Sequence, residues 1–526
     1  MAETDKVIKA LTKTKIPDLN GLQAFKRQAS KKWSLRQFSN VELLQAYHRM
    51  VKNKSIKASP RLEKILQKRP IRSLSGIVNV SVLTKPYQCP GKCIYCPSQA
   101  NMPKSYLQGE PAAQRAQDLG FDPYKQTKQR IEVLKMTGHA TDKIEMRIIG
   151  GTWSYYPVEY RIDFIKQCFD ACNNKKSKNL EQAQKINETA KNRVVGLSIE
   201  TRPDFINEDE IKFLRALGVT KVELGVQSIY DDVLKFCQRD HNTQTTIKAT
   251  QLLKDAGFKV SYQMMPNLPK SGLKRDLAMF KELFSNPDFK PDYLKIYPLV
   301  LLKEAPLHKL WRKKQFKDYS EKELKDLIIK IKTLVPRYVR IERIIRDIPS
   351  QYALNEAAKV TNLRQYILAE MTKKNLQCNC IRCREVGSDK HDHNIKMFRS
   401  DYQASQGQEI FLSFENQSRT KLYSMLRLRI PSQVLAKKKH FLPVLQDAAI
   451  IREVHTYGVQ TPIAENKKTA SQHKGLGKAL IKEAERIAKE EFNLKKIAVI
   501  AAIGTREYYR KNEYTFSASY LVKTKK

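Results

Sequence analysis

The chain has 526 residues, which is too long for a single hydrophobic core and enough for three or four domains. Hydrophobic residues make up 41% of it, which excludes a globally disordered chain, and no run of about 18 apolar residues predicts a membrane-spanning helix. The 97 Lys and Arg outnumber the 54 Asp and Glu and leave a formal charge of +43. We therefore expect a polyanionic partner, and nucleic acid is a commoner partner of this kind than a membrane.

Residues 1–73 are predicted to form a basic helical arm. The stretch from Val41 to Val51 repeats apolar residues with helical spacing, and a basic run follows from Lys64 to Arg72. Such an arm suits the phosphate backbone of a nucleic acid, although a solvated helical face has the same composition. The segment Met1–Lys6 lacks the apolar core of a signal peptide, so we expect a cytoplasmic protein that has no membrane partner.

Three cysteines, Cys89, Cys93 and Cys96, follow a β-like run with the spacing C-x3-C-x2-C. Thiolates are the usual ligands of iron–sulfur clusters, and three of them leave one iron of a [4Fe-4S] cluster without a protein ligand. That iron can bind the amino and carboxylate groups of S-adenosylmethionine, so we expect this cluster and this cofactor. A zinc loop or buried thiols are the alternatives, but no second cysteine pair follows within about thirty residues to complete a zinc site.

From residue 74 to residue 340, β-like runs alternate with amphipathic segments, which predicts an α/β fold with a partial (β/α) barrel. The predicted strands are Ile77–Leu83, Lys143–Ile149, Val194–Ile199, Lys221–Val226, Phe258–Met264 and Tyr293–Tyr297. Chemistry in such barrels lies at the carboxyl ends of the strands. The residues at these ends that could approach S-adenosylmethionine are Gly150, Gly151, Glu200, Arg202 and Gln227. A glycine after a strand is also typical of a simple turn.

Two further segments of this region are less specific. Asn173–Asn192 is polar and is predicted to be a surface excursion. Arg337–Asp347 carries an arginine at every third position, which on a helix would form one basic stripe and on a strand two faces. Either arrangement fits an RNA backbone, and a solvent-facing ridge is the alternative.

Residues 341–400 are predicted to be a linker with a small metal site. Cys378, Cys380 and Cys383 have the spacing C-x-C-x2-C, and His391 and His393 follow. This pattern favours zinc, with an imidazole or another thiol as the fourth ligand. A second iron–sulfur cluster and free thiols are the alternatives.

Residues 401–526 are predicted to form a mixed α/β domain. The turn Gln472-His-Lys-Gly475-Leu-Gly477 precedes a helix, and such a turn points N–H groups at a ligand such as a pyrophosphate. A buried-strand pattern and the pair Tyr508 and Tyr509 follow the helix. This order matches a GNAT-type acetyltransferase domain, which binds acetyl-CoA.

Taken together, these motifs resemble the catalytic subunit of Elongator, a radical-SAM/acetyltransferase family that modifies the wobble uridine of tRNA. The likeness covers nearly the whole chain from about Lys64, in the compact bacterial or archaeal form, so we expect a monomer or small homo-oligomer. The matching motifs are Tyr87–Pro97, Ser105–Tyr106, Glu110–Pro111, Gly150–Thr152, Glu200–Asp204, Glu223–Ser228, Lys295–Pro298, Arg346–Pro349, Arg452–His455 and Gly504–Arg506.

The resemblance implies a radical reaction that forms 5-carboxymethyluridine. Cys89, Cys93 and Cys96 would hold the cluster, whose electron would cleave S-adenosylmethionine to a 5′-deoxyadenosyl radical. That radical would take hydrogen from the methyl group of acetyl-CoA. The carbon radical would then add to C5 of the uracil, and thioester hydrolysis would leave a carboxymethyl group. The implied partner is the anticodon stem-loop of tRNA, and the sequence does not name the electron donor.

The resemblance also implies contacts with acetyl-CoA. Lys143, counted with the three cysteines among the catalytic residues, would reach it from the barrel. The implied contacts of the second domain are Glu453, Val454, His455, Thr456, Gln472, Gly475, Leu476, Gly477, Lys478, Tyr508 and Tyr509. Glu453 or His455 could instead be the general base of a protein lysine acetyltransferase with a structural cluster domain, and a tRNA-binding scaffold is a third hypothesis.

Overall fold

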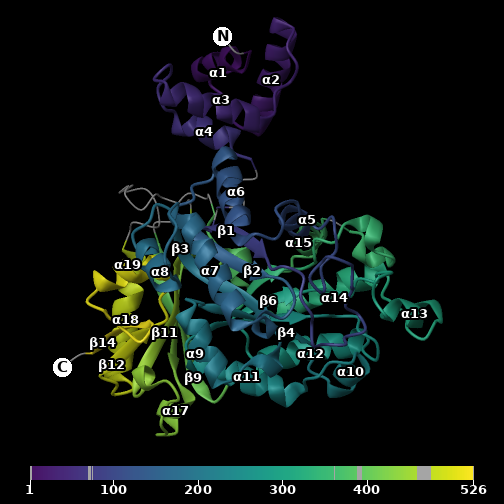
Figure 1. Cartoon of the computed structure of the whole chain (residues 1–526), viewed down its shortest axis with the longest axis vertical. Helices are drawn as coiled ribbons and strands as arrows, with labels where there is room; N and C mark the ends of the chain where they lie inside the picture. The colour runs from purple at the N-terminus through teal and green to yellow at the C-terminus, as the bar shows by residue number, and fades with distance from the viewer. Residues whose placement is uncertain are drawn as a thin grey trace.

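The computed structural model describes residues 3–68, 73, 75–360, 362–387, 394–458 and 475–524. Within these ranges the chain forms a small helical lobe and two seven-stranded sheets with their helices (Figure 1). None of the helices in these ranges is long and apolar enough to cross a membrane.

The N-terminal lobe has a hydrophobic core of its own. Its four helices are α1 (Glu3–Lys13), α2 (Leu19–Trp33), α3 (Asn40–Lys52) and α4 (Pro60–Leu66). Ser39 and Glu42 exchange side chain to backbone hydrogen bonds, and this capping box fixes the start of α3. The buried apolar cluster of the lobe runs from Val7 to Leu66 and includes no residue of either sheet. Figure 1 accordingly shows α1–α4 as a lobe that stands above the rest of the chain.

The first sheet is a row of seven parallel strands in chain order. The strands are β1 (Val78–Leu83), β2 (Lys143–Ile149), β3 (Arg193–Thr201), β4 (Lys221–Gln227), β5 (Lys259–Met264), β6 (Tyr293–Ile296) and β7 (Arg340–Arg343). β1 to β6 overlap the predicted strands, so the prediction of a partial barrel is confirmed. β1 and β7 form the two ends of the sheet, so the barrel is open between them.

Most of the helices between these strands pack on the outer face of the sheet. The helices are α5 (Pro111–Asp118), α6 (Pro123–Met136), α7 (Val158–Asn173), α8 (Leu180–Asn187), α9 (Glu208–Ala216), α10 (Asp231–Phe236), α11 (Thr243–Asp255), α12 (Leu273–Ser285), α13 (Leu307–Arg312) and α14 (Glu321–Leu334). Strand residues alternate between this face and the barrel interior. In β2, Ile144, Met146 and Ile148 are buried in the core that the helices share, whereas Glu145 and Arg147 line a cavity.

The polar segment at 173–192 is a surface excursion only in part: residues 174–182 are mostly exposed, and the rest of the segment packs against the barrel. It contains α8, and Ala183, Asn187 and Glu188 are buried. The side chain of Asn187 donates to the carbonyl of Asn192 at 3.1 Å. Buried polar side chains that bond to the backbone explain why the composition of this segment indicated exposure.

The second sheet has the order β13-β14-β12-β11-β10-β9-β8. Its strands are β8 (Ile395–Ala404), β9 (Gly407–Asn416), β10 (Leu422–Ile430), β11 (Ala448–Thr456), β12 (Lys496–Val499), β13 (Thr515–Ser517) and β14 (Tyr520–Thr524). The β11–β12 pair is parallel and the other described pairs are antiparallel, so the domain is mixed α/β. Its helices are α17 (Ser432–Leu435), α18 (Leu476–Glu490) and α19 (Arg506–Arg510). Between the two sheets the chain forms α15 (Leu363–Lys373) and α16 (Ile381–Arg384).

A continuous hydrophobic core joins the two sheets, and buried ion pairs lie within the join. Arg452 of β11 pairs with Asp292, which precedes β6, at 2.8 Å and with Glu409 of β9 at 2.9 Å. These three side chains are at most 1% exposed. Removing one member would leave an uncompensated buried charge, so the network fixes how the two sheets face each other.

Candidate functional site

The loop that follows β1 carries Cys89, Cys93 and Cys96. Cys93 is buried, and the other two thiols are partly exposed. The N–H of Ile94 donates to the carbonyl of Cys237 at 3.1 Å, and the carbonyl of Ile94 accepts from the N–H of Leu307 at 2.8 Å. Two segments that are distant in sequence therefore hold the loop at the carboxyl end of the barrel.

Buried hydrogen-bond donors surround these thiols. Arg239 donates through Nη1 to the sulfur of Cys93 at 3.3 Å. Arg239 Nε, Arg202 Nη1 and the hydroxyl of Tyr95 are buried and have no hydrogen-bond partner within the described part of the chain. A side chain at Gly91 would clash with Arg202, so the loop also packs closely on this guanidinium. Donors of this kind fit an anionic group held by the thiols.

The spread of the three thiols does not suit a single zinc ion. A tetrahedral zinc with bonds of about 2.3 Å brings its sulfurs to roughly 3.8 Å from one another. Among the described residues, these three are not a group whose ligand atoms all lie within 4.8 Å. Burial, together with Cys93, raises the pKa of Cys96 to about 11, so a metal would have to displace its proton. The geometry favours the iron–sulfur interpretation over the zinc loop.

A cavity of about 220 Å³ adjoins the cysteine loop. The predicted residues that line it are Cys89, Cys93, Cys96, Gly151, Glu200, Arg202 and Gln227. Gly150 does not line it, and its role is local: its φ is +124°, and a side chain there would clash with Thr84. The strand ends therefore bring four of the five predicted S-adenosylmethionine residues together with the thiols.

Glu200 has partners to which the sequence assigned no role. Its carboxylate accepts hydrogen bonds from Lys295 at 3.0 Å, from the hydroxyl of Tyr106 at 2.9 Å and from Gln263 at 3.1 Å. All three line the smaller cavity. Tyr106 and Lys295 lie within the family motifs, but Gln263 has no sequence signal, because an isolated glutamine in a strand is ordinary.

A larger cavity of about 1070 Å³ lies between the barrel and the second sheet. The predicted acetyl-CoA residues that line it are Lys143, Glu453, Val454, His455, Thr456, Gly475, Gly477, Lys478, Tyr508 and Tyr509. Leu476 packs against the hydrophobic core, and Gln472 lies outside the described residues. The structure thus gathers residues of both domains around one space.

The N-terminus of α18 faces this cavity. Gly475, with a φ of +73°, precedes the helix, and no side chain among the described residues caps the first N–H groups. A positive φ favours glycine, and an uncapped helix N-terminus attracts anions. An added side chain at Gly477 would come within 3.3 Å of the hydroxyl of Tyr508, so the turn lies against that tyrosine. This corner suits a phosphate-bearing ligand.

Glu453 and His455 are both engaged in structural contacts. Glu453 pairs with Arg427 at 2.9 Å and accepts a hydrogen bond from the hydroxyl of Tyr293. Burial raises the pKa of Glu453, but the charges of Arg427 and Lys259 outweigh it and lower that pKa overall. His455 bonds through Nε2 to the carbonyl of Ser75 at 2.8 Å. These contacts make either residue a poor general base for amine acetylation.

The two cavities share a wall at the open side of the barrel. The residues that line both are Ser81, Pro111, Ala112, Arg147, Arg343 and Asp347. Ser81 belongs to β1, Arg147 to β2 and Arg343 to β7. A ligand in the larger cavity could therefore approach one in the smaller cavity through the barrel interior.

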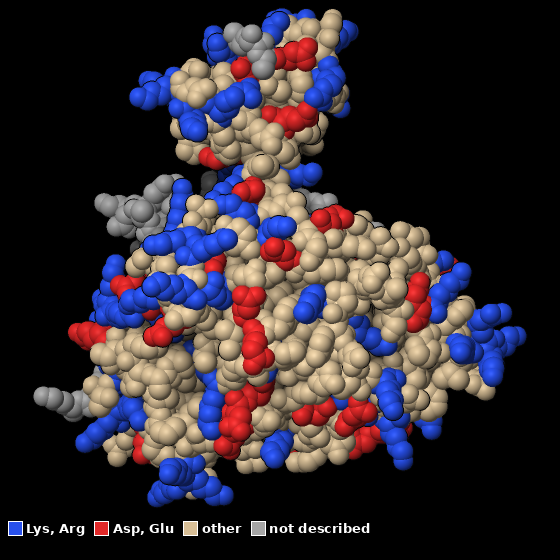
Figure 2. Space-filling view, in the orientation of Figure 1, with Lys and Arg blue, Asp and Glu red and all other residues tan. Residues whose placement is uncertain are grey.

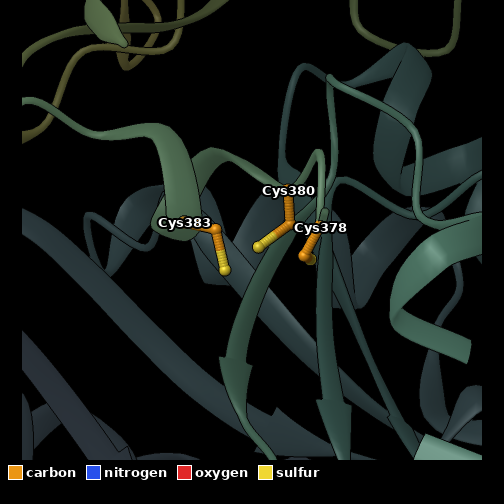
Figure 3. Close-up of side chains that lie close together, drawn as sticks. All are labelled: Cys378, Cys380 and Cys383. Atoms are coloured by element: carbon orange, nitrogen blue, oxygen red, sulfur yellow. The ribbon is translucent and has the colours of Figure 1, made fainter. Parts of the chain in front are cut away.

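Cys378, Cys380 and Cys383 form a separate group beside β7. Their sulfurs lie within 4.8 Å of one another, and Figure 3 shows the three side chains converging from the turn before α16 and from α16 itself. Lys332 donates to the sulfur of Cys383 at 3.5 Å. This arrangement suits a single tetrahedral ion, and the predicted histidine ligands, His391 and His393, lie outside the described residues.

The arginine series is a strand and not a helical stripe. β7 occupies its centre, and the side chains of Arg337, Arg340, Arg343 and Arg346 are all engaged within the chain. Arg337 donates to the carbonyl of Arg419 at 2.7 Å, and Arg340 pairs with Glu385 at 2.7 Å. Arg343 pairs with Asp347 at 2.7 Å, and Arg346 pairs with Glu110 at 3.2 Å. The series therefore organises the barrel edge, and its arginines do not form an unpaired basic ridge.

Comparison with known proteins defines the class. Residues 84–278 match the Radical SAM superfamily, and residues 291–373 match the Radical_SAM C-terminal domain. The barrel is thus a radical-SAM domain, a class whose members use a [4Fe-4S] cluster and S-adenosylmethionine.

The chain belongs to the family of Elongator complex protein 3, as its motifs indicated. It is 48% identical to the tRNA uridine(34) acetyltransferase of Methanocaldococcus infernus over 473 residues, which are 87% of this chain and 88% of that protein. It is 39% identical to Elongator complex protein 3 of Homo sapiens over 474 residues, 87% of this chain and 86% of that one. The solved archaeal Methanocaldococcus infernus Elp3, with residues 1–46 deleted, superposes with a TM-score of 0.76 at 44% identity and covers 86% of this chain and 100% of that chain.

Proposed function

We propose that this chain modifies the wobble uridine of tRNA to 5-carboxymethyluridine with a radical derived from S-adenosylmethionine and with acetyl-CoA as the carbon donor. The observation that carries the proposal is the wall that the two cavities share. A radical reaction between two bound cofactors requires their reacting carbons to meet, and adjoining cavities provide such a place. The relatives named tRNA uridine(34) acetyltransferase support the choice of substrate.

In this proposal Cys89, Cys93 and Cys96 hold the cluster, and the chain orients S-adenosylmethionine with Gly151, Glu200, Arg202 and Gln227. Bound there, the cluster and S-adenosylmethionine supply one-electron chemistry that removes a hydrogen atom from a carbon. Lys295, Tyr106 and Gln263 fix the carboxylate of Glu200, and Arg239 fixes the sulfur of Cys93. These contacts hold the side chains that line the smaller cavity in place before the reaction, so they need not move during it.

The second domain is proposed to be a GNAT-type domain that binds acetyl-CoA and does not acetylate an amine. The turn Gly475–Lys478 would take the pyrophosphate, and Tyr508, Tyr509 and strand β11 would hold the rest of the molecule. Lys143, at the barrel end of the larger cavity, has a pKa lowered by burial. The engaged state of Glu453 and His455 argues against the alternative, a protein lysine acetyltransferase.

The charge of the chain supports tRNA as the polyanion. Figure 2 shows Lys and Arg side chains spread over the helical lobe α1–α4 and over the side of the molecule that carries α8 and α19. We propose the lobe, residues 1–73, as a tRNA-binding arm, because lysine-rich helices on a separate lobe can track a phosphate backbone. The anticodon stem-loop would then reach the larger cavity.

A structural zinc ion at Cys378, Cys380 and Cys383 completes the proposal. Three sulfurs within 4.8 Å of one another fit the tetrahedral geometry that zinc prefers. The segment that these cysteines hold lies beside β7, where the N–H of Ile381 donates to the carbonyl of Val339 at 2.9 Å. Zinc there would fix the linker between the two domains.

Mass spectrometry of nucleosides tests the function. Reconstituted protein is incubated without oxygen with tRNA, S-adenosylmethionine, a reductant and acetyl-CoA that carries ¹³C in its methyl group. We expect labelled 5-carboxymethyluridine. Cys93→Ala should form none, whereas Cys172→Ala, which removes a buried thiol of α7 remote from the loop, should retain it. Product formed by an iron-free Cys93→Ala protein would refute the radical route.

A further inference from the structure

The wall between the two cavities holds an arginine with unused hydrogen-bond donors. The side chain of Arg147 is 14% exposed and faces the barrel interior. Its Nη2 donates to Glu223 at 2.9 Å, whereas its Nε is buried without a partner. Nη1 has no hydrogen-bond partner among the described residues either. Because a guanidinium has five N–H donors, most of the donors of Arg147 remain available.

Ser81 offers a second donor at the same place. It is the direct neighbour of Arg147 in the β1–β2 ladder, and side chains opposite each other in a ladder share a face. Both residues line both cavities. The hydroxyl of Ser81 has no hydrogen bond within the described part of the chain. The junction thus presents a hydroxyl and a guanidinium from adjacent strands.

The charges around this junction indicate what it would bind. A connected cluster of ion pairs fills the barrel interior, and its members are Arg147, Lys221, Lys295, Glu145, Glu200, Glu223 and Glu342. Its four carboxylates already outnumber its three cations, so a further full anion such as a phosphate gains little there. A neutral acceptor such as a carbonyl oxygen can use the free N–H groups without adding charge.

We propose that Arg147, together with Ser81, binds the carbonyl oxygen of the acyl thioester at this junction. The inference rests on the proposed function, in which acetyl-CoA extends from the larger cavity toward the smaller one. Hydrogen removal breaks one C–H bond of the methyl group, and the hydrogen atom passes to the adenosyl carbon. The unpaired electron that remains is shared between the methyl carbon and the carbonyl oxygen. Donors aimed at that oxygen stabilise this product and hold the methyl group in place.

The first experiment measures binding and needs no cluster. Calorimetry on the purified chain compares acetyl-CoA with S-ethyl-CoA, a thioether that lacks the carbonyl oxygen. The wild-type chain should bind acetyl-CoA about tenfold more tightly, because one charge-assisted hydrogen bond is lost with the thioether. Arg147→Met should bind the two ligands equally.

The matched control is Arg193→Met. Arg193 begins β3 and lines only the larger of the two cavities, and its Nε donates to the carbonyl of Ala190 at 3.1 Å. The Arg193→Met substitution removes one positive charge from the larger cavity and leaves Arg147 and Ser81 unchanged. This variant should therefore keep the preference for acetyl-CoA. If Arg147→Met also keeps that preference, the proposal is wrong. If the wild-type chain binds neither ligand, the proposed function itself fails.

The second experiment separates a role at the carbonyl from a role in folding. Glu223 retains Lys295 and, at 3.6 Å, Lys221 in Arg147→Met, so the fold should persist, and the thermal midpoint checks it. In the reconstituted enzyme the ratio of 5-carboxymethyluridine to 5′-deoxyadenosine should fall about 100-fold in Arg147→Met, the usual scale for losing such a donor. Arg147→Lys should recover part of the ratio. A parallel fall of both products with an unchanged ratio would overturn the proposal.

Discussion

The two cysteine groups of this chain look alike in sequence and differ in space. The sulfurs of Cys378, Cys380 and Cys383 lie within 4.8 Å of one another, whereas Cys89, Cys93 and Cys96 do not form such a group. The group of Cys89, Cys93 and Cys96 lines a cavity, and donors around it have no partner among the described residues, while the group of Cys378, Cys380 and Cys383 lines neither of the two cavities. The spacing of cysteines along the chain therefore does not decide their role, because the surrounding side chains and the distance between sulfurs do.

The largest expected effect is the loss of the iron–sulfur cluster when a cysteine of the Cys89, Cys93 and Cys96 group is replaced. Cys93→Ala should lose its iron, its charge-transfer absorbance and all detectable 5-carboxymethyluridine, because an incomplete ligand set cannot hold the cluster. Cys380→Ala should keep iron and retain activity. Metal analysis and nucleoside mass spectrometry on both variants measure this. An active Cys93→Ala protein, or an iron-free Cys380→Ala protein, would reverse the assignment of the two groups.

A smaller effect is expected at Arg239, which donates to the sulfur of Cys93. Hydrogen bonds to cluster sulfurs tune reduction potential, so Arg239→Met should make the cluster harder to reduce and slow 5′-deoxyadenosine formation about tenfold. Redox titration followed by electron paramagnetic resonance measures the potential. Arg275→Met, which removes a partly exposed arginine paired with Asp232 at 2.7 Å, is the control and should leave the potential unchanged.

The second cysteine group should affect stability more than chemistry. Cys380→Ala should abolish zinc binding and lower the melting midpoint by about 5 °C, because binding energy at a structural metal site is folding energy. Calorimetry and zinc analysis test this, with Cys168→Ala, at another buried thiol, as the control. Zinc-free wild-type protein would show that these thiols have another role.

The smallest effect at neutral pH is expected at His241, which lies near the first group. Burial, with Arg239 and Arg202 nearby, lowers the pKa of His241 to about 3. An unfolded histidine has a pKa near 6.5, so the unfolded chain binds the proton first, and stability falls as the pH drops from about 6.5 toward 3. His241→Gln stays neutral and should lose about 2 kcal/mol less than the wild type at pH 5.

Thermal unfolding at pH 7.5 and at pH 5 measures this difference. The two proteins should melt together at the higher pH. An equal acid-induced drop in both would mean that His241 is protonated in the folded chain.

The barrel strands were predictable because they are apolar runs bounded by turns and helices. β7 was not predicted, since four residues with three charged side chains look like a basic surface segment. β8 begins at Ile395, before the boundary placed at residue 400. Only one of its ten residues is buried, so its sequence lacks the apolar pattern that predicts a strand. α8 was missed because its residues are polar, whereas the side chain of Asn187 bonds to Asn173 of α7 and to the backbone instead of to water.

The candidate site divides in the same way. The cysteine loop and the Gly475–Lys478 turn are continuous motifs, so a role could be proposed for each from neighbouring residues. By contrast, the ion pairs of Glu223 with Arg147 and Lys295 join three different strands. No periodicity in the sequence predicts that these side chains lie in contact.

By itself the sequence determined the parallel barrel, the cysteine loop and the family, because each can be predicted from local residue spacing and short motifs. Only the tertiary structure decided that the two cavities share a wall and that the second cysteine group stands apart from both. These are consequences of how two sheets pack through a common core with buried ion pairs such as Arg452–Asp292. Contacts between residues so distant in the chain depend on closing the whole fold, which no local pattern specifies.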